Sequence, residues 1–192
     1  MIRLRNEIVF RGEPDETHTP VRSTSNRGVG LLEAFERELL TLLPRLSRFA
    51  RSLARDGADA DDLVQAALER ALAARTQWQP GTRLDAWMLK IMRNCWIDEL
   101  RRRTRRARTF AAEEEGFGVT VEAGDGRSAD RDAVDRAMNA LIPEQREVVA
   151  LVLVEGLSYR EAADLLELPI GTLTSRLSRA RQALVQRLET AS

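Results

Sequence analysis

The sequence predicts an all-α protein made of two small helical domains joined by a flexible acidic linker. Apolar residues recur at helical spacing over residues 31–108 and again over 129–192, and no stretch of useful length alternates as a strand would. Between these blocks, residues 109–128 contain four glycines and five acidic residues against the single Arg127, a composition typical of a linker. Residues 1–30 lack sustained periodicity and are expected to form a flexible leader.

The first block predicts three helices. The apolar run over 31–55 contains Pro44, so either a kink or two successive helices are expected, because proline cannot donate the helical hydrogen bond. A second helix is predicted from about Asp59, a suitable N-cap, to about Ala74. After the loop 75–83, a third helix is predicted to open at Thr82, where T-R-L-D resembles a capping box, and to run to about residue 103.

The second block predicts a helix–turn–helix arrangement. Pro143 suits the first turn of a helix that stops at Gly156. Ser158 and Glu161 form a capping box for a helix over 159–166. A last helix is predicted to start near residue 170 and to bury residues at helical spacing: Ile170, Leu173, Leu177, Ala180, Leu184 and Leu188.

Composition narrows the class of protein. Lys and Arg total 30, as do Asp and Glu, so the net charge of zero by itself indicates no partner. The single Cys95, expected to be a buried thiol, and the lone His18 offer no metal-ligand pair. No nucleophile–base pair, metal cluster or phosphate loop is visible, so we expect neither an enzyme nor a cofactor. No apolar run approaches the roughly 20 residues of a membrane span, and no signal peptide is evident, so a cytoplasmic protein is expected.

The last predicted helix has a polar, basic outer side. From residue 170 to 188 it contains four arginines and no acid, and its outward positions are Thr172, Ser175, Arg176 and Arg179. Such a helix suits the DNA major groove, where arginine can fork onto guanine. The alternative is an ordinary helical hairpin with a solvated basic face. The pattern alone favours neither.

Two further stretches carry concentrated charge. In 96–108, six of the last eight residues are arginine. With aromatic residues nearby, such a stretch could bind single-stranded nucleic acid, whose bases stack on rings while arginines contact the backbone. The alternative is a solvated helix end whose cations suit the helix C-terminus. Of the nearby tryptophans, Trp87 and Trp96 are expected in the core and Trp78, in a loop, at the surface. The acidic stretch 59–70 is either a docking face for a basic partner or, as we favour from this stretch alone, charge compensation at a helix start.

Taken in order, these three stretches resemble the extracytoplasmic-function (ECF) group of bacterial sigma factors over roughly 31–188. DADDLVQ is similar to the family's core-polymerase-binding helix, and LDAWMLKIMRNCWIDELRRR to its melting and minus-ten helix. ALIPEQREVVALVLVEGLSYREAADLLELPIGTLTSRLSRAR resembles its minus-thirty-five-binding domain. The resemblance implies sigma region 2 over 31–108 and sigma region 4 over 129–192, in a factor that directs promoter recognition, DNA melting and transcription initiation.

The resemblance also implies partners and residue roles. Core RNA polymerase would be contacted by Asp59, Asp61, Asp62, Leu63 and Gln65. The melted minus-ten strand would be contacted by Trp78, Arg83, Arg93, Asn94, Ile97, Asp98 and Arg101. The minus-thirty-five duplex would be contacted by Thr172, Ser175, Arg176 and Arg179. The acidic linker would thread polymerase channels.

The sequence departs from the family pattern at four positions. Glu167 stands in a turn that usually holds glycine, which predicts an adjusted or strained backbone. Thr174 replaces a commonly basic residue, and Leu84 and Met92 replace an aromatic and a small residue. ADDLVQAALERALA with WQPGTRLDAWM nevertheless looks like the alphaproteobacterial general-stress subgroup. That likeness implies a stress regulon and an anti-sigma protein as a further partner.

Two other functions fit part of the sequence. A sigma-like decoy that only binds an anti-sigma protein would lose basic residues on the last helix, yet Arg176, Arg179 and Arg181 are present. A stand-alone helix-turn-helix regulator would need a dimerisation element, and no heptad seam is visible. The opposite charges of the linker and the arginine-rich helices further predict that the two domains contact each other in the free protein.

Overall fold

The computed structural model describes residues 26–111 and 129–191, with side chains over 33–109 and 133–190. Within these ranges the chain is helical and contains no strand, as predicted. The predicted leader and linker lie largely outside the described residues, in 1–25 and 112–128. The N-terminal domain (26–111) holds α1 (Asn26–Leu53), α2 (Gly57–Ala73), the short η1 (Arg75–Gln77) and α3 (Leu84–Ala111). The C-terminal domain (129–191) holds α4 (Ala129–Asn139), α5 (Pro143–Val149), η2 (Ala150–Val154), α6 (Tyr159–Leu166) and α7 (Ile170–Ala191).

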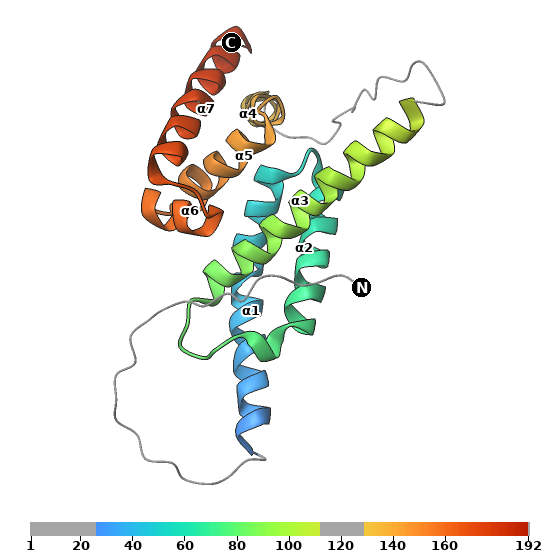
Figure 1. The fold of residues 1–192 in the computed structure, drawn as a ribbon, viewed down its shortest axis with the longest axis vertical. Coiled ribbons are helices and arrows are strands. Elements are labelled where there is room, and N and C mark those ends of the chain that lie inside the picture. The colour runs from blue at the N-terminus through green and yellow to red at the C-terminus, as the bar shows by residue number, and fades with distance from the viewer. Residues whose placement is uncertain (1–25, 112–128, 192) are drawn as a thin grey trace.

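The N-terminal domain is a bundle in which α1 and α2 contact α3 (Figure 1). Its core combines large residues of α1 and α3 with small residues of α2, which let the helices approach closely: Phe35, Leu46, Phe49, Met88, Met92, Ala60, Ala67 and Ala71. Cys95 and Trp96 are buried as predicted. The prediction of two successive helices at Pro44 is wrong, because α1 continues through it. Pro44 and Leu40 are both exposed, so water can bond the Leu40 carbonyl that Pro44 leaves without a helical donor.

Two helix starts differ from the prediction. The N-cap of α2 is Asp56, not Asp59, and its carboxylate accepts a hydrogen bond from the Asp59 backbone N–H at 2.8 Å. Helix α3 starts at Leu84, and the Thr82 hydroxyl donates to the Gln79 carbonyl at 2.6 Å instead of forming a capping box. At its other end α3 continues well past residue 103, since arginine and alanine favour helix and cations suit a helix C-terminus.

The C-terminal domain follows its predicted signals closely. Pro143 lies in the first turn of α5, and the chain turns at Gly156 with a φ of 70°. The Ser158 hydroxyl accepts from the Glu161 N–H while the Glu161 carboxylate accepts from the Ser158 N–H, so the capping box is confirmed. Helix α7 buries Leu173, Leu177 and Ala180, but the predicted burial of Ile170 is wrong, since it is 54% exposed at the helix start.

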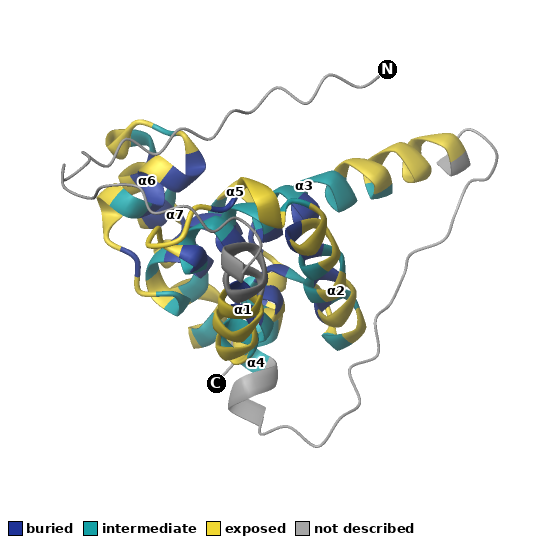
Figure 2. Ribbon diagram, turned by 90° about the horizontal axis from the view of Figure 1, so that it is seen from below, coloured by how far each residue is buried: buried dark blue, intermediate teal, exposed yellow. Residues whose placement is uncertain are grey.

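The two domains contact each other, as the sequence predicted. One core cluster runs through both, and η2 lies against α1. The Arg146 guanidinium of α5 donates to the Leu53 carbonyl at the end of α1 at 3.0 Å, and the Asn139 amide donates to the Arg55 carbonyl at 2.9 Å. Figure 2 shows buried residues gathered where the helices face one another, while the last turns of α3 project away and are exposed. Among the described residues, no helix is long and apolar enough to cross a membrane.

Candidate nucleic-acid and polymerase interface

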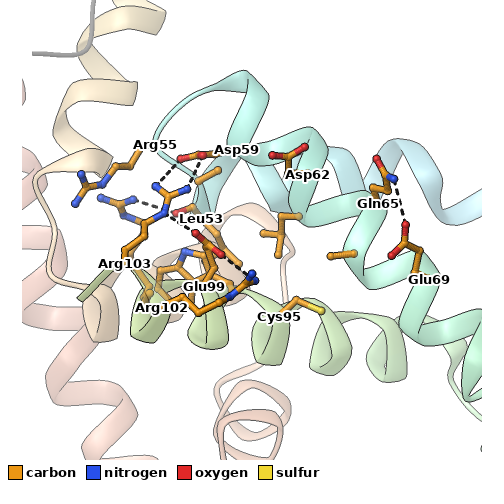
Figure 3. Close-up of a pocket in the computed structure, with 16 residues that line it drawn as sticks. Leu53, Arg55, Asp59, Asp62, Gln65, Glu69, Cys95, Glu99, Arg102 and Arg103 are labelled. Atoms are coloured by element: carbon orange, nitrogen blue, oxygen red, sulfur yellow. Dashed lines mark hydrogen bonds and ion pairs between the residues drawn. The ribbon is translucent and has the colours of Figure 1, made fainter. Parts of the chain in front are cut away.

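The acidic residues of α2 border a groove between α2 and α3 (Figure 3). The groove has a volume of about 350 Å³ and combines apolar and charged walls. Of the predicted polymerase contacts, Asp59, Asp62, Leu63 and Gln65 line it, and Asp61 does not. Leu63 is buried in its floor, while Asp61, Asp62 and Gln65 are exposed. The structure therefore places four of the five predicted residues around one concave surface.

One of these acids already has a partner within the domain. Both Asp59 carboxylate oxygens accept from the Arg103 guanidinium, at 2.8 and 2.5 Å, and Arg103 also donates to Glu99 at 2.9 Å. The hydrogen bonds from Arg103 hold the pKa of Asp59 below its usual range, although burial opposes this shift. This link between α2 and α3 was not predicted from the sequence. Only the pair of Glu99 and Arg103 within α3 has a sign in the sequence, the i,i+4 spacing of the two residues.

Trp78 lies in the core, so the prediction that it is exposed is wrong. Its side chain is only 7% exposed, and its ring centroid lies 5.4 Å from that of Phe35 in α1. The ring centroid of Trp87 lies 6.1 Å from that of Phe35 in an edge-on arrangement. Trp78 thus packs against Phe35 in the core, and a base could not stack on Trp78 in this conformation.

The remaining predicted minus-ten residues lie at the start of α3 and along it. Arg83 and Arg101 are exposed, while the residues between them are half-buried: Arg93, Asn94, Ile97 and Asp98. Positions 93, 97 and 101 are spaced by four and share one helix face. Asp98 forms an ion pair with Arg70 of α2 at 3.0 Å. Arg83 forms ion pairs with Asp85 at 3.0 Å and with Glu161 of α6.

Asp85 anchors this end of α3. Burial by itself would raise the pKa of its carboxyl, but hydrogen bonds from Arg83 and Arg45 lower that pKa to about 2. The carboxylate therefore stays ionised at any pH near neutrality, and it holds two arginines at the edge of the N-terminal domain.

The predicted minus-thirty-five residues lie on α7, and only two of the four are fully exposed to solvent. Ser175 and Arg179 are exposed, whereas Thr172 and Arg176 are half-buried. The turn before α7 contains Glu167, the one non-glycine residue with positive φ among those described, at 56°. This left-handed C-cap confirms the adjusted backbone predicted for a glutamate in that turn.

Glu147 of α5 connects the two predicted DNA surfaces, although its sequence pattern predicted no such role. Its carboxylate accepts from Arg93 of α3 at 3.0 Å and lies 3.6 Å from Arg176 of α7. The side chain is buried, and burial raises the pKa of its carboxyl while the two arginines oppose that rise. One acid thus neutralises an arginine on each helix. No local pattern could reveal this, because the three residues come together only in the packed domains.

Comparison with known proteins identifies both domains. Residues 39–106 match the Sigma-70 region 2 family and residues 131–184 match the Sigma-70, region 4 family. The chain is 35% identical over 156 residues to the ECF RNA polymerase sigma factor EcfG of Rhodopseudomonas palustris, across 80% of this chain and 84% of the relative. It is 32% identical over 178 residues to the ECF RNA polymerase sigma factor SigF of Caulobacter vibrioides, across 92% and 98%.

A solved structure agrees with these relatives. The sigma factor RpoE from Bartonella quintana, in complex with the anti-sigma factor NepR, matches with a TM-score of 0.70 and 35% identity, over 82% of this chain and 98% of that one. Because the family matches fall on both helical domains and the relatives align over most of their own length, the chain belongs to the extracytoplasmic-function group of RNA polymerase sigma factors.

Proposed function

We propose that this sigma factor reads promoters with its two domains while the groove between α2 and α3 holds core RNA polymerase. The observation that carries the proposal is the separation of charge on the N-terminal domain, where acids of α2 border the groove and arginines line α3. Asp61, Asp62 and Gln65 would face a basic surface of the polymerase, with Leu63 as the apolar floor. Asp59 would act through its fork with Arg103, which ties α2 to the arginine-rich helix.

The arginines along α3 and the polar outer side of α7 support the DNA contacts that we propose. Arg93, Asn94, Ile97, Asp98 and Arg101 would follow the melted minus-ten strand along α3, and Arg83 would approach its edge. Trp78 would support the loop 75–83 from the core, consistent with its burial. The exposed Ser175 and Arg179, together with Thr172 and Arg176, would approach the minus-thirty-five duplex. The activity is promoter selection rather than catalysis, and it places the protein in the cytoplasm with the polymerase.

We also infer that the regulon is a stress regulon under an anti-sigma protein. The support is the likeness to RpoE, whose solved structure contains the anti-sigma factor NepR. Copurification from the native cell tests this, since a small partner bound to the sigma factor in unstressed cells is expected. Recovery of polymerase alone under all conditions would contradict the regulatory part of the proposal and leave the promoter-reading part intact.

In vitro transcription tests promoter reading itself. Purified chain with core polymerase is expected to yield promoter-dependent transcripts from candidate stress promoters. A gel shift separates the alternatives: a stand-alone regulator would bind duplex DNA tightly without polymerase, and a decoy would bind it in neither case. No transcript on any candidate promoter would count against the proposal.

Arg179→Ala is expected to lower transcription from a promoter with a minus-thirty-five element by about tenfold. A lost arginine contact to a base or phosphate costs about 1–3 kcal/mol, and Arg179 is exposed, so folding should be unaffected. Run-off transcription on one promoter measures the change. Arg187→Ala removes an exposed arginine farther along α7 and serves as the matched control. Equal losses in both variants would contradict a specific role for Arg179.

A further inference from the structure

One end of the groove between α2 and α3 carries more positive charge than its ion pairs neutralise. Arg55 and Arg103 lie at this end, while Gln65 and Glu69 lie at the other (Figure 3). Arg146 of α5 also lines the groove. Arg103 already forms ion pairs within its own domain. Among the described residues, neither Arg55 nor Arg146 forms an ion pair with a carboxylate, so this end has two cations without a counter-ion of their own.

Arg146 is a buried cation whose hydrogen-bond donors are only partly used. The residue is 6% exposed, and its guanidinium donates to the carbonyls of Leu53 and Asn139 at 3.0 and 2.6 Å, although an arginine has five N–H donors. Its Nε atom is buried and has no partner among the described residues. Burial and, after it, the charge of Arg55 lower the pKa of Arg146 to about 10, so the guanidinium is still charged near neutral pH. Carbonyls at helix ends offer only partial negative charge, so a full anion would stabilise this cation further.

The groove has room and apolar wall for the organic part of a small ligand. Its volume of about 350 Å³ lies within the range of small-molecule pockets. Apolar side chains from α1, α2 and α3 form much of the wall: Leu53, Leu63, Trp96 and Leu100. A guanidinium fork matches two oxygens of a carboxylate or a phosphate. Two unpaired cations favour the phosphate, because a phosphate monoester can carry two negative charges and a carboxylate only one.

We propose that this end of the groove binds the phosphate group of a small organic phosphate. Arg55, which is exposed, would make the first contact, and Arg146 would pair with the phosphate through donors that its carbonyl partners leave unused. Asp59 stays on Arg103, so the ligand displaces no existing ion pair. The site goes beyond the proposed function and does not rest on it, because neither polymerase nor promoter DNA takes part in the binding.

NMR titration of the full chain with phenyl phosphate tests the site at Arg146 itself. The Nε–H resonance of Arg146, assigned from its loss in Arg146→Lys, is expected to shift and to saturate as the phosphate binds. Inorganic phosphate should shift the same resonance with about five- to tenfold lower affinity, because it lacks a ring for the apolar wall to cover. Sodium chloride at the same ionic strength should leave the resonance unchanged, which separates binding from screening.

Arg55→Gln is expected to weaken the binding of phenyl phosphate by about tenfold, because a hydrogen bond to a charged group is lost. Arg55 is exposed, so this variant should fold, and it tests the site even if Arg146→Lys does not fold. In that case the indole N–H of Trp96, in the wall of the same groove, provides the resonance. Arg51→Gln is the matched control: Arg51 is exposed on α1 and does not line the groove, and the change in net charge is the same. Its affinity should stay within about twofold of the unmodified protein.

No saturable shift with either phosphate, or equal weakening by Arg55→Gln and Arg51→Gln, would overturn the inference and leave Arg146 as a structural link between two helix ends. A short single-stranded DNA without terminal phosphates distinguishes a small ligand from the promoter backbone. It is expected to leave the Arg146 resonance unchanged, and a shift with DNA but none with phenyl phosphate would also overturn the inference. Promoter reading is tested separately by transcription with core polymerase, so failure of this site would not touch the proposed function.

Discussion

Replacing Asp62 with arginine is expected to weaken binding of the protein to core RNA polymerase by about a hundredfold. Asp62 is exposed at the edge of the groove between α2 and α3, so the substitution should leave folding intact. If the groove receives a basic surface of the polymerase, the reversal places like charges together, which costs several kcal/mol, and each 1.4 kcal/mol is about tenfold in affinity. Titration of labelled sigma factor with core polymerase measures the change.

Glu36→Arg provides the control for that experiment. Glu36 is exposed on α1 and is absent from the lining of the groove, yet the change in net charge is the same. Its affinity for polymerase should stay within about twofold of the unmodified protein, as expected for an isolated surface charge. Equal weakening by both variants would show that net charge, and not the groove, governs the interaction.

Replacing Phe35 with alanine is expected to lower the free energy of unfolding of the N-terminal domain by about 3–5 kcal/mol. Phe35 is fully buried, and its ring contacts both Trp78 and Trp87. Truncation removes the transfer free energy of the ring and leaves a cavity that rigid neighbours fill poorly. Trp78 would also lose the partner that holds it inside.

Urea denaturation followed by tryptophan fluorescence measures this loss. All three tryptophans lie in the N-terminal domain, so their fluorescence reports on that domain alone. Leu40→Ala on the same helix is the control, because Leu40 is exposed and its truncation should change stability by no more than about 0.5 kcal/mol. Similar effects of the two substitutions would contradict the central place of Phe35 in the core.

The helix boundaries that carry strong local signals were predictable from the sequence. The capping box at Ser158 and Glu161, Pro143 in the first turn and the turn at Gly156 depend on residues within one helical turn, and all three are confirmed. The start of α2 was predicted wrongly, and of the two alternatives at Pro44, a kink or two successive helices, the second is wrong. Asp56 and Asp59 both suit an N-cap, and a proline within an apolar helical pattern is compatible with a kink or a break, so the local rules left more than one outcome open.

The candidate site divides in the same way. The acidic stretch of α2, the arginines of α3 and the outward residues Ser175 and Arg179 follow from helical spacing and residue type, because a helix face is a local property. The burial of Trp78 did not follow, since it depends on Phe35, more than forty positions away in the sequence. The position of Trp78 in a loop predicted that it is exposed, but its contact with Phe35 keeps it buried.

By itself the sequence determined two helical domains, their order and the chemistry that each presents to polymerase or DNA. These properties follow from periodicity, helix caps and charge clusters, which depend on residues only a few positions apart in the sequence. Only the tertiary structure decided which charges are free. Asp59 bound to Arg103, and Glu147 set between Arg93 and Arg176, come from helices far apart in the chain. Ion pairs depend on distance in space, which residue type and spacing along one helix do not specify.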